Sequence, residues 1–109
     1  MASNSTKASI AQKEIPGALQ VLPNTPTDVT TMDTWLFQVV LNNKTAGAVT
    51  VTITDNAGTP LDLLTAVSIA ANTAYVIAFP EGQYMPGGFK WSASAATSIN
   101  GSVKGFRES

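Results

Sequence analysis

The stretch that decides the fold class reads AVTVTIT and occupies residues 48–54. Its apolar residues alternate with threonines, so the apolar side chains are expected to face a core and the threonines to face solvent. Valine, isoleucine and threonine all suit the pleated, half-buried surface of a sheet. The turn-forming sequence DNAG follows at residues 55–58. Together these residues predict a β-strand with one buried face.

Similar alternation recurs on both sides of this strand. It predicts further strands at residues 35–42, 66–69, 74–79, 89–95 and 99–106. About six short strands at this spacing, without a convincing helix, are typical of an antiparallel sandwich or barrel. The predicted fold class is therefore all-β, a small antiparallel β-sandwich of jelly-roll-like or Ig-like type. Asn100-Gly101 could instead form a two-residue hairpin turn, but a continuous strand keeps Ile99 and Val103 in phase.

The aromatic residues follow the alternation too. In the predicted strand 35–42, Trp35 and Phe37 are in phase with Val39 and Leu41 and are expected to share one face with them. Tyr75 and Trp91 are also in phase with apolar neighbours in their strands. We therefore expect Trp35, Tyr75 and Trp91 to pack in the core rather than to form a sugar-binding platform on the surface.

The first third of the chain has a different composition. Residues 1–33 hold three of the six prolines and no aromatic residue, and they predict an extended arm in front of a sandwich domain at 34–109. The arm is expected to have a mobile tip through Ser9 and an anchor-bearing part that binds a partner. The expected anchors are the apolar residues Ile10, Ile15, Leu19, Val21 and Leu22.

A second candidate binding element lies between the strands predicted at 74–79 and 89–95. Residues 80–88 are rich in proline and glycine and predict the longest loop of the domain. Tyr84 and Met85 form a large apolar pair in this loop. Such a pair is either tucked under the loop or presented to a partner, and we include both residues among the candidate partner-binding residues.

Composition excludes several kinds of chemistry. The 109 residues contain no cysteine and no histidine, which removes disulfides, thiolate sites and the commonest general base. The carboxylates fall mostly in predicted loops, where aspartate forms turns, and the alternative for Asp55-Asn56 with Asp62 is a calcium site. We therefore expect a protein that is not an enzyme and has no cofactor, no metal and no catalytic residues.

Charge argues against two classes of partner. Six Lys and Arg against seven Asp and Glu give a net charge of −1, too little positive charge for a nucleic-acid surface or a polybasic membrane anchor. No apolar run approaches the length of a membrane span. The polar N-terminus lacks the apolar region of a secretory signal, so the chain is expected either to be made and assembled inside a cell or to be supplied without its targeting segment.

The second half of the chain resembles small structural proteins of tailed bacteriophages. The resemblance rests on VSIAANTAYVIAFPEG at 67–82, YMPGG at 84–88 and WSASA at 91–95, together with the strand and turn at 49–58. It implies a virion component, either a capsid cement (decoration) protein or a collar or tail accessory protein. The implied partners are the major capsid protein or other virion subunits, with a homo-oligomer, trimer or dimer, as the expected state. It implies no functional residues, because the shared features include no catalytic motif.

The preferred hypothesis is a structural protein on the capsid surface of a virion, assembled in the host cytoplasm, that stabilises the shell by bridging capsid subunits. The alternative is a carbohydrate- or receptor-binding module of a phage tail, fibre or adhesin. That alternative predicts that Tyr84 and one tryptophan are exposed to solvent.

Overall fold

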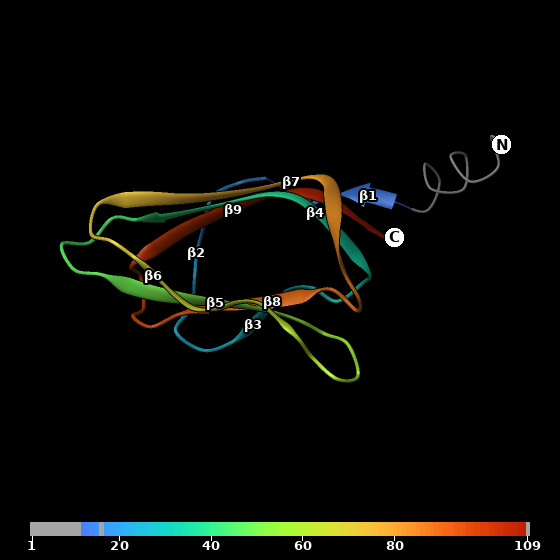
Figure 1. Cartoon of the computed structure of the whole chain (residues 1–109), viewed down its shortest axis with the longest axis horizontal. Coiled ribbons are helices and arrows are strands. Elements are labelled where there is room, and N and C mark those ends of the chain that lie inside the picture. The colour runs from blue at the N-terminus through green and yellow to red at the C-terminus, as the bar shows by residue number, and fades with distance from the viewer. Residues whose placement is uncertain (1–11, 16, 109) are drawn as a thin grey trace, which may run out of the picture.

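The computed structural model describes residues 12–15 and 17–108, and this part of the chain is a β-sandwich of two antiparallel sheets (Figure 1). Nine strands follow one another along the chain: β1 (Gln12–Glu14), β2 (Gln20–Val21), β3 (Thr27–Thr30), β4 (Thr34–Asn43), β5 (Val49–Asp55), β6 (Asp62–Ile69), β7 (Thr73–Met85), β8 (Phe89–Ala93) and β9 (Ile99–Glu108). The predicted fold class, an all-β antiparallel sandwich, is confirmed.

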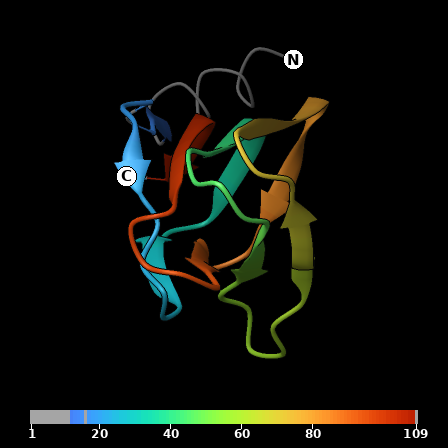
Figure 2. The same cartoon turned by 90° about the vertical axis from the view of Figure 1, so that its left-hand side faces the viewer.

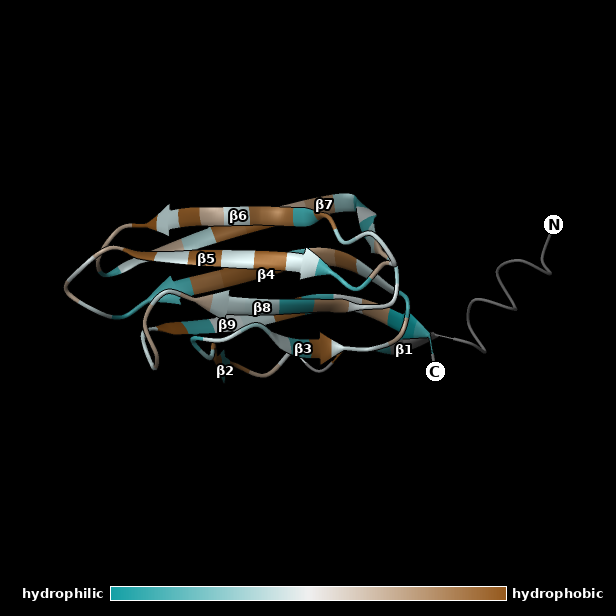
Figure 3. Ribbon diagram, turned by 90° about the horizontal axis from the view of Figure 1, so that it is seen from below, coloured by the Kyte–Doolittle hydropathy of each residue, from teal (hydrophilic) through white to brown (hydrophobic). Residues whose placement is uncertain are grey.

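One sheet has five strands in the order β1-β9-β4-β7, with β2 also pairing with β9. The other has four strands in the order β3-β8-β5-β6. The two sheets pack face to face, and their inner side chains form one core. In Figure 3 the four-stranded sheet lies in front, and β6 and β7 run along the same long side of the sandwich.

The predicted strand at 48–54 is observed as β5, with the expected alternation. Val51 and Ile53 are fully buried, while Thr50, Thr52 and Thr54 lie on the outer surface. Residues 99–106 form one strand, β9, so the hairpin alternative at Asn100-Gly101 is wrong.

The segment predicted as the longest loop, 80–88, is mostly strand. β7 continues through Pro80 to Met85, and only the turn around Gly87 separates it from β8. Proline and glycine are tolerated here because β7 is an edge strand and pairs only with β4 in the described part of the chain. The strand predicted at 66–69 is also longer than expected, because β6 begins at Asp62.

The predicted arm is part of the sandwich wherever the structure describes it. β1 and β2 extend the five-stranded sheet and β3 forms an edge of the four-stranded sheet. Between them, Leu22 N donates to the Ile99 carbonyl at 2.9 Å, and Ala93 N donates to the Pro23 carbonyl at 2.9 Å. This segment therefore joins both sheets along one side (Figure 2). The predicted boundary at 33 does not separate it from the domain.

Leu22 explains why the segment stays in place. Its side chain is fully buried, and it occupies the space beside Gly101 of β9. A Cβ atom at Gly101 would lie 2.7 Å from Leu22 Cδ1 and 3.0 Å from the Trp91 ring. Gly101 thus makes room for two large apolar side chains in the core.

Candidate partner-binding face

The two outer faces of the sandwich differ in chemistry. On the four-stranded sheet, the outward residues of β5 are Thr50, Thr52 and Thr54, and their register partners on the neighbouring strands are polar. These partners are Asp62 and Ser68 on β6 and Lys90 and Ser92 on β8. This face, called here the threonine face, presents hydroxyl and charged groups to solvent.

The outer face of the five-stranded sheet carries aromatic side chains at one end. Glu14, Phe106, Trp35 and Tyr84 are register partners across β1, β9, β4 and β7, so they form one row across the sheet. Phe37 lies beside this row. We call Trp35, Phe37, Tyr84 and Phe106 the aromatic row.

The aromatic rings contact one another in pairs. Trp35 and Tyr84 lie with ring centroids 5.1 Å apart and planes tilted by 35°. Phe37 and Phe106 meet edge to face at 5.9 Å and 83°. Both are favourable geometries for aromatic pairs. Tyr84 is 43% exposed and Phe106 is 40% exposed, so the row keeps apolar area open to solvent.

A β-bulge places these aromatics outside. Leu36 pairs with Gly105 and Gln38 pairs with Lys104, so Phe37 is an extra residue on β4. The bulge changes the phase of the strand: Leu36 and Val39 are both fully buried, although they are three residues apart. The prediction that Trp35 and Phe37 share the core face with Val39 and Leu41 is therefore wrong.

β7 accommodates the bulge with a larger irregularity of its own. Its residues 79–82 lie between the pairs Gln38–Ala78 and Leu36–Gln83. Gly82 has φ of +85°, and a Cβ atom there would approach the Phe37 ring to 3.2 Å. Glycine at 82 thus permits both the backbone conformation and the close approach of the ring.

Tyr84 is held in place by the end of the predicted arm. Its hydroxyl donates to Asp33 Oδ2 at 2.9 Å, and Gly87 N donates to Asp33 Oδ1 at 2.7 Å. The hydrogen bond to Asp33 raises the pKa of Tyr84, and desolvation and the charges of Asp33 and Glu108 act in the same direction. Tyr84 is therefore an oriented, neutral side chain at ordinary pH.

A cleft of about 490 Å³ adjoins Tyr84. Its lining comes from the β5–β6 connection and the end of β7: Asp55, Leu61, Asp62, Leu63, Gln83, Tyr84, Met85 and Pro86. Leu61 is 70% exposed at its rim. The cleft combines apolar surface with carboxylate and amide groups.

Asp55 and Asp62, the candidate calcium ligands, both hold local structure through hydrogen bonds. Asp55 Oδ1 accepts the backbone N–H groups of Ala57 and Leu61 and closes the turn. The Asp62 carboxylate accepts the hydroxyls of Thr54 and Thr65, which lower its pKa. Across residues 12–15 and 17–108, no group of three or more acidic, His or Cys side chains is placed to hold a metal ion.

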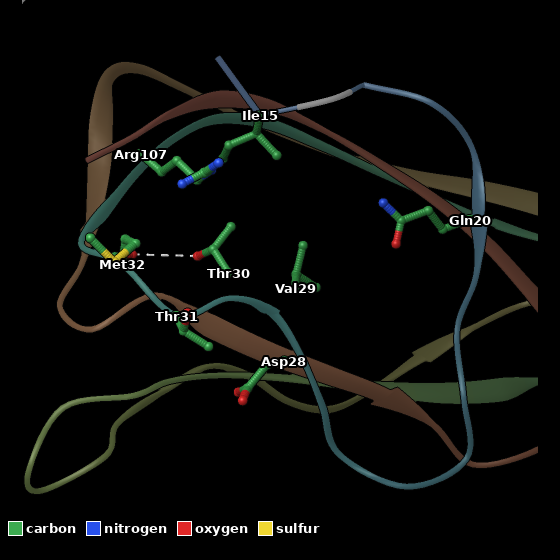
Figure 4. A pocket seen from close by; sticks show the side chains of 8 residues that line it. All are labelled: Ile15, Gln20, Asp28, Val29, Thr30, Thr31, Met32 and Arg107. Carbon is green, nitrogen blue, oxygen red and sulfur yellow. Dashed lines mark hydrogen bonds between the residues drawn. The ribbon is translucent and has the colours of Figure 1, made fainter. Parts of the chain in front are cut away.

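A second hollow, of about 450 Å³, opens on the opposite long side of the sandwich (Figure 4). It is lined by Ile15, Gln20, Asp28, Val29, Thr30, Thr31, Met32 and Arg107. Most of this lining belongs to the segment that was predicted as an arm. These residues are therefore part of the folded domain.

The described part of the chain contains no helix that is long and apolar enough to cross a membrane.

The predicted partner-binding residues fall into three groups. Ile15, Leu22 and Met85 are buried in the core of this chain and are not available as anchors. Leu19, Val21 and Tyr84 are exposed, at 68%, 50% and 43%. Ile10 lies outside the described residues.

Some of the other aromatic residues lie where they were predicted, and others do not. Trp91 is buried, at 3% exposure, and Tyr75 packs against the core from β7, as expected. Sequence reasoning missed Phe106 and Phe37 as surface residues. The alternation of residues 99–106 does place Phe106 out of phase with Ile99 and Val103, and that signal could have identified it.

No protein-family model and no curated protein matches this chain. Among solved structures, a similar chain occurs in the "Structure of infectious bursal disease virus Gx strain", with a TM-score of 0.40 and 12% sequence identity. The alignment covers 87% of this chain and 29% of that one, so this chain spans less than a third of the viral chain's length.

Proposed function

We propose that this protein is a non-enzymatic structural component of a virus particle, a capsid cement protein that docks on the shell through the aromatic row. The observation that carries the proposal is the contrast between the two outer faces. The threonine face is polar, whereas the other face exposes Tyr84 and Phe106 beside Trp35. Exposed aromatics clustered on one face mark protein-binding surfaces.

The architecture suits a passive bridging role. A rigid sandwich presents the aromatic row without a large ordering cost, because Tyr84 is already fixed by Asp33. The polar threonine face would then point away from the shell. The same role is the one that a resemblance to small structural proteins of tailed phages would imply, and the absence of histidine and cysteine from the whole sequence disfavours an enzyme.

The test is binding to purified shells assembled from the major capsid protein of the same particle. Tyr84→Ala and Phe106→Ala are compared with Ser68→Ala, which lies on the threonine face. Truncating an aromatic at the centre of a protein interface costs about 2 kcal/mol or more, or roughly a thirtyfold loss of affinity. We expect that loss for the two aromatic variants and none for Ser68→Ala. Equal binding by all three would overturn the proposal.

The anchor role predicted for Ile10 needs a separate experiment. A variant that begins at Gln12 removes Ile10 but keeps β1 and the buried residues Ile15 and Leu22. Reduced occupancy on the shells, with unchanged circular dichroism, supports an anchor in residues 1–11. Unchanged occupancy assigns the docking to the sandwich alone.

The cleft beside Tyr84 favours a second candidate, a carbohydrate-binding module. Aromatic faces stack on sugars, and the Asp62 and Gln83 groups in the cleft could bind hydroxyls. Trp35 would report binding, because it lies 5.1 Å from Tyr84, whereas Trp91 is buried. A glycan array followed by fluorescence titration tests whether the protein binds carbohydrate. Absence of hits, with unchanged Trp35 fluorescence, removes this candidate.

A further inference from the structure

β7 leaves one edge of the five-stranded sheet open. Within the described residues, β7 pairs only with β4, although it is the longest strand of the sandwich at 13 residues. Half of the backbone N–H and C=O groups of an edge strand point away from its neighbour and can pair with a further strand. An open edge of this length therefore needs either a protective feature or a partner.

The other edges carry such protective features. β6 has register shifts, a positive φ of 46° at Ala66 and the charged Asp62. β3 has only four residues and a register shift after Asp28. β1 and β2 are very short, and Pro16 and Gly17 fall between them in the sequence. Shortness, bulges, charge and proline all discourage pairing with another chain.

The two halves of β7 differ in whether they carry features that discourage pairing with another chain. Its second half contains Pro80, Glu81 and the irregular Gly82, which protect that part of the edge. The first half, TAYVIAF at 73–79, has no charge, no proline and no glycine. From Thr73 to Ala78 it pairs with β4 in unbroken register. It is thus an uncharged edge in regular register, without proline, glycine or a bulge to protect it.

This half also leaves apolar area uncovered. Val76 points outward and is 55% exposed. Tyr75, Ile77 and Phe79 pack against the core only in part, at the side of the sandwich where β6 and β7 run together. A strand added at this edge would cover the exposed flank of these side chains.

The stretch 73–79 is compatible with its own copy. Antiparallel pairing about a two-fold axis through Val76 sets Tyr75 opposite Ile77 of the other copy, and Ala74 opposite Ala78. Pairs of an aromatic with a β-branched residue are favourable across strands. No charged residue then faces its like, whereas a register shifted toward the C-terminus would bring the two Glu81 residues together.

We propose that this protein forms a two-fold symmetric dimer in which residues 73–79 of β7 pair antiparallel with the same residues of a second copy, centred on Val76. The two five-stranded sheets become one continuous sheet, and both aromatic rows lie on the same side of it. A small domain gains stability from such burial. The dimer does not depend on the proposed shell role, because it is tested with the isolated protein.

The first test measures the oligomeric state by sedimentation velocity over a range of concentrations. Val76→Lys places like charges opposite each other at the axis, while Val21→Lys makes the same change at the other edge of the same face. The two valines are 55% and 50% exposed, so neither variant loses core packing. We expect dimers for the wild type and Val21→Lys, and at least severalfold weaker dimerisation for Val76→Lys.

The second test fixes the register by cross-linking. The chain has no cysteine, so Val76→Cys introduces a single thiol that meets its own copy at the axis. We expect mild oxidation to yield a disulfide-linked dimer of Val76→Cys and little of the control Val21→Cys. A wild type that stays monomeric at all concentrations would overturn the proposal. So would equal behaviour of the position 76 and position 21 variants in both tests.

Discussion

The hydroxyl of Tyr84 donates a 2.9 Å hydrogen bond to Asp33, which also accepts a bond from Gly87 N. Asp33 is the last residue of the segment predicted as an arm, and Tyr84 belongs to β7. The bond therefore ties the first third of the chain to the aromatic row. It also makes the ionisation of Tyr84 a reporter of that connection.

Alkaline titration is expected to detect this bond. The acceptor Asp33, desolvation and negative charge raise the pKa of Tyr84 above its ordinary value of 10.0. The neutral phenol is favoured in the folded state, so its stabilising contribution is present below pH 10 and is lost as pH rises through the folded-state pKa. Tyrosinate absorbance should show a component that titrates above the ordinary pKa of tyrosine, and Tyr84→Phe should remove that component.

The control for this titration is Asp33→Asn, which keeps an acceptor oxygen but removes the charge. We expect it to bring the pKa of Tyr84 closer to the ordinary value. If the wild type and Asp33→Asn titrate identically, Asp33 does not perturb Tyr84.

Two leucines of the same segment should differ strongly in their effect on stability. Leu22 is fully buried, whereas Leu19 is 68% exposed. Replacing a buried leucine by alanine costs about 2–5 kcal/mol, while surface substitutions usually stay within about 0.5 kcal/mol. Urea unfolding of Leu22→Ala and of Leu19→Ala measures the loss in the free energy of unfolding that each substitution causes. Similar small losses would mean that this segment is not part of the folded domain.

The sequence predicted strands well where a strand has no bulge. β5 and β8 keep strict alternation from end to end, so their buried faces followed directly from their residues. β4 does not, because the extra residue Phe37 changes its phase in the middle. A bulge depends on the register of both neighbouring strands, and those contacts are far away in the sequence.

Contacts between residues that are distant in the sequence also explain why the predictions for Leu22, Pro80 and Gly82 were wrong. Leu22 stands next to Pro23 and shows no periodicity, yet Gly101 of β9 leaves a space that only a distant part of the chain can fill. Pro80 and Gly82 have the composition of a loop, and only their place at a sheet edge permits a strand. The aromatic row follows from these long-range features and not from local pattern.

A buried asparagine should be essential for the loops at one end of the sandwich. Asn43 is fully buried; its side-chain N–H groups donate to the carbonyls of Gly47 and Ile69, and its Oδ1 accepts from Thr45 N. Asn43→Ala removes these three hydrogen bonds from the protein, at a cost of about 2–4 kcal/mol. The exposed neighbour Asn42 provides the control, since Asn42→Ala should change the free energy of unfolding by less than about 0.5 kcal/mol. Equal values for the two variants would contradict this role.

The close contact between β4 and β9 gives the last prediction. A Cβ atom at Gly105 would collide with the Trp35 carbonyl oxygen, and backbone atoms cannot move aside as a flexible side chain can. Gly105→Ala should therefore push β9 away from β4 and destabilise the protein by about 1–3 kcal/mol. Because Phe106 follows directly, the shift should also disturb its contact with Phe37 and change the near-ultraviolet circular dichroism. Gly58→Ala, where a Cβ meets no atom within 4 Å, is the control and should leave both measurements unchanged. If Gly105→Ala behaves like Gly58→Ala, the close approach does not constrain the sheet.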